Sequence, residues 1–162
     1  YRELGDFANQ PFDMRLDRDS LIFIRNGGLY LDKRYSTEVK KRFNLSDEGL
    51  DFSISVDTEY DREVYYLSEL NLHFFDYEGL RVNKKKLKNI DIFRSKTLEL
   101  STELFSLKID IGVKSDILIY KVNTVHQSEQ GVDFTTQGIA IVFPFRFRGS
   151  LKIKGSIELK GK

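Results

Sequence analysis

The chain has 162 residues with 26 basic and 25 acidic side chains, so its formal net charge is only +1. This balance excludes the strong positive field with which a dedicated nucleic-acid binder attracts phosphates. Cysteine is absent, which excludes disulfides, thiolate metal sites and cysteine nucleophiles. We predict a single β-sandwich domain over residues 1–162, because a chain of this length suits one hydrophobic core.

Apolar and polar residues alternate along most of the chain, which is typical of strands with one buried face. The alternation predicts strands at residues 21–25, 29–32, 52–57, 63–67, 70–74, 97–101, 107–113, 117–122, 139–147 and 151–159. The Asn26-Gly27 pair suits a tight turn with positive φ angles, so we predict a hairpin between the first two strands. A short helix is predicted at residues 36–44, where Ser36 can cap and Val39 and Phe43 lie four residues apart.

These elements predict an all-β fold, either an antiparallel β-sandwich of the immunoglobulin-like kind or a barrel, with about eight to ten strands and one short helix. No apolar run reaches the roughly 18 residues that a membrane-spanning helix needs. The sequence begins at Tyr1 without Met or a signal peptide, so we interpret it as a fragment that lacks its native N-terminus.

The stretch "GIAIVFPFRFRGSLKIKGSIELKG" places an apolar row beside a basic row. We expect the apolar row, with Phe143 and Phe145 pointing inward, to belong to the core, because leaving it in water would cost about 1.5 to 3 kcal/mol for each large side chain. If the interior instead leaves a cavity, it could hold a lipid or another apolar ligand. The predicted ligand-binding residues are then Phe74, Phe105, Phe143, Phe145 and Phe147.

The basic residues form the candidate contact surface. Their alternation with the apolar row predicts an outward basic face, and a second cluster occurs in "NKKKLKN". An exposed basic face attracts phosphates, but single-strand binders also need exposed aromatic rings on that face, so nucleic acid is not expected. The predicted basic surface comprises Arg146, Arg148, Lys152, Lys154, Lys84, Lys85 and Lys86.

We find no motif for catalysis, a cofactor or a metal. The acidic stretch "DTEYDRE" fails as a calcium loop, because positions six and twelve counted from Asp57 are Arg62 and Ser68 rather than glycine and glutamate. The glycine-rich, zinc-protease and nucleophile-elbow patterns are also missing. We therefore predict no catalytic residue, no metal, no cofactor and no enzyme activity, although a carboxylate pair assembled only by the fold stays open.

The segments "LDFSISVDTEYDREVYYLSELNLHFFDYEGLRV", "KTLELSTELFSLKIDI" and "GIAIVFPFRFRGSLKIKG" follow one another in a strand order that resembles the late-embryogenesis-abundant type 2 proteins, the WHy domain. Gly79 and residues 138–144 match that order. The resemblance implies an immunoglobulin-like β-sandwich with a stress-protective, lipid-binding or envelope-associated role.

The function that these observations favour is a non-catalytic structural or interaction module of a cell envelope or larger assembly. The alternative is a carrier that binds a lipid or another apolar ligand inside the sandwich or barrel. We expect a protein partner, with a lipid or membrane surface as a second partner, and a location in the cell envelope or periplasm.

Overall fold

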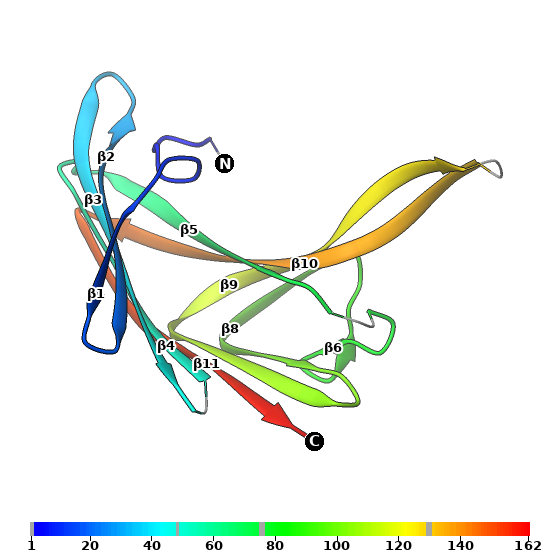
Figure 1. Ribbon diagram of the computed structural model, residues 1–162. Helices are drawn as coiled ribbons and strands as arrows, with labels where there is room; N and C mark the ends of the chain where they lie inside the picture. The colour runs from blue at the N-terminus through cyan, green and yellow to red at the C-terminus, as the bar shows by residue number, and fades with distance from the viewer. Residues whose placement is uncertain (1, 48, 75–76, 129–130) are drawn as a thin grey trace. The chain divides into compact units, whose positions relative to one another are not determined.

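The computed structural model describes residues 2–47, 49–74, 77–128 and 131–162 (Figure 1). These residues contain strands and no helix, so the predicted all-β class is confirmed. No helix that could cross a membrane occurs in the described part of the chain. The strands are β1 (Asp13–Asp17), β2 (Ser20–Tyr30), β3 (Arg34–Ser46), β4 (Gly49–Thr58), β5 (Glu63–Leu72), β6 (Arg81–Val82), β7 (Lys85–Lys86), β8 (Ile90–Ser101), β9 (Phe105–Ser128), β10 (Gly131–Arg148) and β11 (Ser150–Gly161).

The chain divides into two compact units, each made of separate stretches of sequence. Unit 1 comprises residues 1–65, 109–112 and 146–158, and unit 2 comprises residues 66–108, 113–145 and 159–162. The strands β5, β9, β10 and β11 each carry residues of both units. The single-domain prediction for residues 1–162 stays a prediction.

Unit 1 is an antiparallel meander of β1, β2, β3 and β4, continued by β11 on the other side of β4. Residues 109–112 of β9 lie against β11 so closely that a Cβ at Gly112 would overlap the carbonyl oxygen of Lys154. A Cβ at Gly155 would likewise overlap the carbonyl oxygen of Asp110. Glycine is needed where two backbones meet at this distance. The buried apolar residues of the unit are Ile22, Val39, Ile54, Val56, Val64, Ile109, Ile111 and Ile153.

In unit 2, β10 pairs with both β5 and β9, and the order continues through β8 and β6 to β7. The β9 and β10 strands form a long antiparallel pair, with Ile141 opposite Ile119 (Figure 1). Consecutive residues 139–141 of β10 are all buried, which shows that both faces of the strand are covered there. The core residues of the unit are Phe74, Leu80, Val82, Leu87, Leu98, Leu100, Ile117, Ile119, Ile139, Ala140, Ile141, Phe143 and Phe145.

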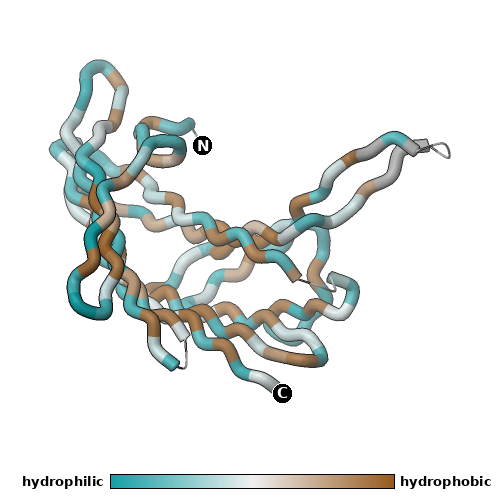
Figure 2. Tube along the Cα trace, in the orientation of Figure 1, coloured by the Kyte–Doolittle hydropathy of each residue, from teal (hydrophilic) through white to brown (hydrophobic). Residues whose placement is uncertain are grey.

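The predicted apolar row of residues 139–147 is confirmed as the inner side of β10. Phe143 and Phe145 are 5% and 4% exposed, whereas the side chain of Arg146, the next residue, is 64% exposed. The turn between β10 and β11 falls at Gly149, whose φ is +68°. Leu159 breaks the predicted pattern, because it is 58% exposed near the end of β11. Figure 2 shows the alternation of hydrophobic and hydrophilic residues along the strands.

The helix predicted at residues 36–44 is wrong. These residues lie inside β3, which pairs with β2 on one side and with β4 on the other. A spacing of four places Val39 and Phe43 on one face of a strand as well as on one face of a helix, so this spacing could not separate the two. The Ser36 N–H donates to the Glu59 carboxylate at 3.1 Å, which ties the start of β3 to the segment after β4.

The hairpin predicted at Asn26-Gly27 is also wrong, because β2 runs without a break from Ser20 to Tyr30. The two glycines there make room for the N-terminal segment. A Cβ at Gly27 would overlap the Asp6 carboxylate, and the Gly28 N–H donates to the same carboxylate at 3.0 Å. Arg25 adds an ion pair to Asp6 at 2.8 Å. The glycines therefore serve a close approach instead of a turn.

Candidate functional site

The five phenylalanines predicted to bind a ligand belong to the packed interior of the two units. In unit 2, Phe74 is buried, and its ring stacks on the half-buried Phe105 with centroids 5.8 Å apart and an angle of 11°. Phe143 and Phe145 are buried in the same unit, and Phe147 is half-buried in unit 1. The rings thus contribute to stability, and ligand binding by them stays a prediction.

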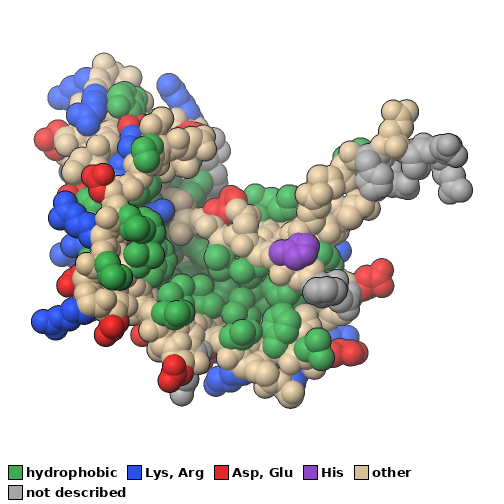
Figure 3. All heavy atoms as spheres, viewed as in Figure 1, with side chains coloured by type: hydrophobic (Ala, Val, Ile, Leu, Met, Phe, Trp, Pro, Cys, Tyr) green, Lys and Arg blue, Asp and Glu red, His purple; other side chains and the backbone are tan. Residues whose placement is uncertain are grey.

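The predicted basic surface is exposed at every position. Arg146, Arg148, Lys152 and Lys154 are exposed in unit 1, and residues 84–86 are exposed in unit 2, where Lys84 lies in the turn after β6 and Lys85 and Lys86 form β7. The Glu63 carboxylate lies 2.6 Å from the Arg146 guanidinium, and its hydrogen bond and charge raise the pKa of Arg146. Figure 3 shows acidic side chains interspersed with lysine and arginine on the visible face of the molecule. Binding of a partner by this surface stays a prediction.

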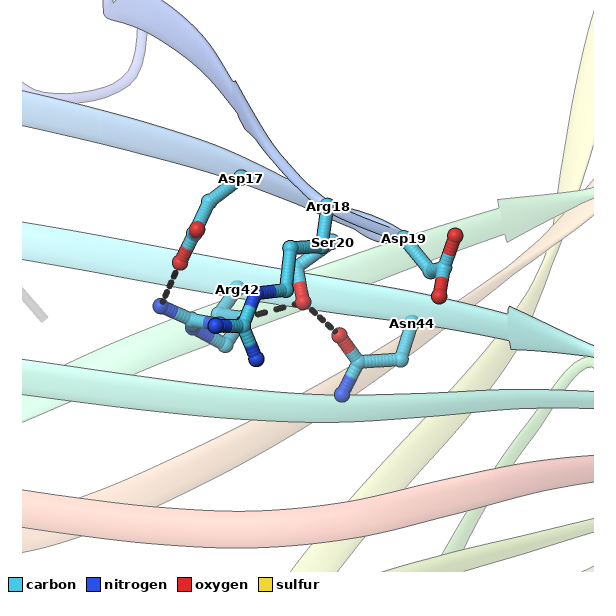
Figure 4. A pocket seen from close by; sticks show the side chains of 6 residues that line it. All are labelled: Asp17, Arg18, Asp19, Ser20, Arg42 and Asn44. Atoms are coloured by element: carbon cyan, nitrogen blue, oxygen red, sulfur yellow. Dashed lines mark hydrogen bonds and ion pairs between the residues drawn. The ribbon is translucent and has the colours of Figure 1, made fainter.

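Two pockets lie in unit 1, and we name each by its lining. The polar pocket has a volume of about 480 Å³ and is lined by Asp17, Arg18, Asp19, Ser20, Arg42 and Asn44 (Figure 4). The tyrosine pocket has a volume of about 360 Å³ and is lined by Leu31, Asp32, Tyr35, Tyr60, Asp61 and Arg62. Both volumes fall in the range of sites for small molecules.

The polar pocket is held together by bonds among its own side chains. Arg42 donates to the Asp17 carboxylate at 2.9 Å and to the Ser20 hydroxyl at 3.0 Å, and Ser20 donates to the side chain of Asn44 (Figure 4). These bonds join the turn between β1 and β2 to β3. Four of its six lining residues therefore already bond to one another, and these bonds tie β1 and β2 to β3.

The tyrosine pocket combines aromatic rings with charged groups. Tyr35 and Tyr60, both half-buried, meet edge to face with ring centroids 4.9 Å apart and an angle of 70°. The Tyr35 hydroxyl donates to the Asp32 carboxylate at 3.0 Å. That hydrogen bond holds the pKa of Asp32 below its usual value. Partial loss of water contact, followed by the bond to Asp32, raises the pKa of Tyr35. Asp32 is therefore an ionised hydrogen-bond acceptor at neutral pH.

The connections that carry this pocket are joined by backbone and side-chain bonds. The Glu59 N–H donates to the Ser36 carbonyl at 3.0 Å, and the hydroxyl oxygens of Thr37 and Thr58 lie 2.7 Å apart. These bonds fix the start of β3 beside the end of β4. The residues before β3 and after β4 therefore share one end of the sheet in unit 1.

The sequence reasoning missed the tyrosine pocket. The stretch containing Tyr60, Asp61 and Arg62 fails as a calcium loop, and residues 31–35 match no motif. The sequence signal that could have indicated this pocket is that residues 31–35 and residues 60–62 each contain an aspartate and a tyrosine.

Among the described residues, no group of three or more histidine, cysteine or acidic side chains could hold a metal ion.

Comparison with known proteins places this all-β antiparallel chain in a class of β-sandwich domains found in carbohydrate-active enzymes. The chain belongs to the family described as "Alpha-amylase/4-alpha-glucanotransferase, C-terminal", whose model matches residues 1–157.

Relatives in two organisms support this membership. The 4-alpha-glucanotransferase of Thermococcus litoralis is 24% identical over 94% of this chain, and the alpha-amylase of Pyrococcus horikoshii is 30% identical over 95% of it. This chain spans 22% of the length of each relative.

Solved structures agree on the fold. The crystal structure of the Thermococcus litoralis enzyme matches 98% of this chain with a TM-score of 0.84 at 23% identity, and the match covers 24% of that enzyme. A putative aldose 1-epimerase from Escherichia coli matches 93% of this chain with a TM-score of 0.66 at 9% identity, and the match covers 69% of that protein.

These comparisons correct the predicted family and function. The resemblance to late-embryogenesis-abundant type 2 proteins is wrong, because the match to the other family covers nearly the whole chain. The strand order behind that resemblance is shared by many sandwiches, and residues 59–61 lack the Asn-Pro pair of that family. The non-catalytic envelope module, the lipid carrier and the prediction of no enzyme are also wrong, because the relatives are named as enzymes.

Proposed function

We propose that this chain is the C-terminal domain of an enzyme that acts on α-1,4-linked glucans. The observation that carries the proposal is the family match over residues 1–157. Two relatives named 4-alpha-glucanotransferase and alpha-amylase support it, because each aligns with nearly the whole of this chain.

The chemistry of glycosidic-bond cleavage indicates which groups such an enzyme needs in its active site. Cleavage commonly uses one carboxylic acid that protonates the leaving oxygen and one carboxylate that acts as nucleophile or base. The acid needs a raised pKa, whereas the hydrogen bond from Tyr35 lowers the pKa of Asp32. We propose that the reacting carboxyl groups come from the part of the enzyme beyond this chain, and that this domain supports that part and contacts the glucan.

The experiment is an incubation of the full natural protein containing this chain with maltoheptaose, followed by chromatography of the products. We expect the single oligosaccharide to become a series of other lengths. Transfer between chains keeps the number of reducing ends constant and also yields longer products, whereas hydrolysis raises that number and yields only shorter ones. A reducing-end assay on the same samples therefore separates the two reactions.

Cellohexaose, which has β-1,4 linkages, is the matched control and should stay unchanged. If the protein leaves maltoheptaose, amylose and amylopectin all unchanged, the proposed function is wrong.

A further inference from the structure

The two tyrosines of the tyrosine pocket lie on segments that are held in place by hydrogen bonds. Tyr35 lies at the start of β3 and Tyr60 is the second residue after β4, and the bonds of Ser36 with Glu59 hold these two segments together. The Tyr35 ring is fixed further by its hydrogen bond to Asp32 and by the Lys33 ammonium, which lies 5.0 Å from the ring centroid. Little ordering is therefore left for a ligand to impose, which favours binding.

The lining has the two kinds of group that a pyranose sugar requires. A pyranose has apolar C–H patches and a rim of hydroxyl groups. Tyr35, Tyr60 and Leu31 offer apolar surface to the C–H patches, as aromatic rings with a polar tip commonly do in binding sites. Asp32 and Asp61 can accept hydrogen bonds from hydroxyl groups, and Arg62 can donate them. All three charged residues are exposed at the pocket.

The charges at the pocket favour a neutral ligand. Its lining has two carboxylates and one guanidinium, and the Lys33 ammonium over Tyr35 balances the second carboxylate. An anion would meet Asp32 and Asp61, and a divalent cation would lack a third acidic ligand in the lining. A neutral ligand rich in hydroxyl groups matches this arrangement.

We propose that the tyrosine pocket binds glucosyl units of an α-glucan chain through Tyr35, Tyr60 and Asp61. The identity of the sugar rests on the proposed function, whereas the preference for a neutral, hydroxyl-rich ligand rests on the pocket alone. The ionised Asp32 can accept hydrogen bonds from the sugar but has no proton to donate to a leaving oxygen.

The test is native electrophoresis of the full natural protein through gels that contain amylopectin at several concentrations. Retardation against concentration gives a dissociation constant. We expect wild type to be retarded and Tyr60→Ala to bind about tenfold more weakly, since an aromatic contact contributes on the order of one such factor. Asp61→Asn, which keeps both rings and changes an exposed residue, should also weaken binding. Tyr65→Ala is the matched control, because Tyr65 is a 46% exposed tyrosine of the same unit outside the pocket.

Gels containing hydroxyethylcellulose test the linkage and should retard no variant. The inference is overturned if wild type runs unretarded in amylopectin, or if Tyr60→Ala and Asp61→Asn are both retarded as strongly as wild type. Activity on maltoheptaose is measured in parallel. Loss of retardation in the two pocket variants of a protein without glucan activity would overturn the proposed function and support the site. Full activity on maltoheptaose, with both pocket variants retarded as strongly as wild type, would support the proposed function and overturn the site.

Discussion

Replacing Phe145 by alanine tests whether the apolar row of β10 is a wall of the core. The side chain is 4% exposed, so the substitution removes nearly all of its transfer free energy, about 1.5 to 3 kcal/mol. A residual cavity of about 80 Å³ would add about 2 kcal/mol, at roughly 24 cal/mol per Å³. We therefore expect Phe145→Ala to lower the free energy of unfolding by about 3 to 5 kcal/mol.

The assay is urea denaturation followed by fluorescence and circular dichroism, with Arg146→Ala as the neighbouring control. Arg146 points outward and pairs with Glu63 at the surface, so its loss should leave the urea midpoint nearly unchanged. A near-neutral Phe145→Ala in a protein that keeps its sheet spectrum would contradict this account. The phenylalanines would then lie on a surface.

Three further predictions concern single residues. Gly112→Ala should destabilise the protein more than Gly149→Ala. Both glycines have a positive φ, but only at Gly112 would a new Cβ meet a backbone carbonyl, that of Lys154. The urea midpoints of the two variants measure the difference. Burial opposes ionisation of Asp6, but bonds from the Gly28 N–H and Arg25 outweigh it and lower the pKa of Asp6 below 3.8. The ionised Asp6 therefore stabilises the fold above pH 3.8, and this stabilisation is lost as the pH falls through the lower pKa of the folded protein. In Asp6→Asn, the urea midpoint should depend less on pH in this acidic range. Burial raises the pKa of Tyr66 from 10.0 to about 12. The free energy of unfolding should therefore decrease as the pH rises from 10 to about 12, and Tyr66→Phe should remove that decrease.

The sheet class and the strands of the second half could be predicted because period-two alternation is a direct record of a buried face. The row from Ile139 to Phe147 was placed correctly on this basis. The predicted strands at 107–113 and 117–122 proved to be one strand, β9, since alternation alone does not show whether a strand continues through polar residues such as Lys114 and Asp116. The β1 strand was missed although Met14 and Leu16 alternate with Asp13, Arg15 and Asp17, and its alternation records no burial, because all five residues are exposed.

The two local errors had physical causes that lie far away in the sequence. The Asn26-Gly27 pair predicts a turn because the sequence does not show that Asp6 packs over the glycines of β2. Residues 36–44 were assigned to a helix because the spacing of Val39 and Phe43 fits either structure, and the pairing with β2 and β4 decides between them.

The error at residues 36–44 also hid the tyrosine pocket. In a meander of β2, β3 and β4, the connection before β3 and the connection after β4 lie at the same end. Tyr35 and Tyr60 can then be expected to meet, whereas a helix between them leaves their distance open. The remaining details, such as the edge-to-face contact of the rings, depend on side-chain packing that no pattern in the sequence records.

The order in which the chain is synthesised gives the composition of unit 1 a further consequence. The meander of β1 to β4 leaves the ribosome before residues 150–158 of β11, the second partner of β4. Until then one edge of β4, with Ile54 and Val56, lacks its partner strand. Unpaired apolar edges are sites of aggregation in slowly folding proteins. On this strand Ile54 and Val56 alternate with Ser53, Ser55 and Asp57. Every second position of the unpaired edge is therefore polar until β11 has been synthesised.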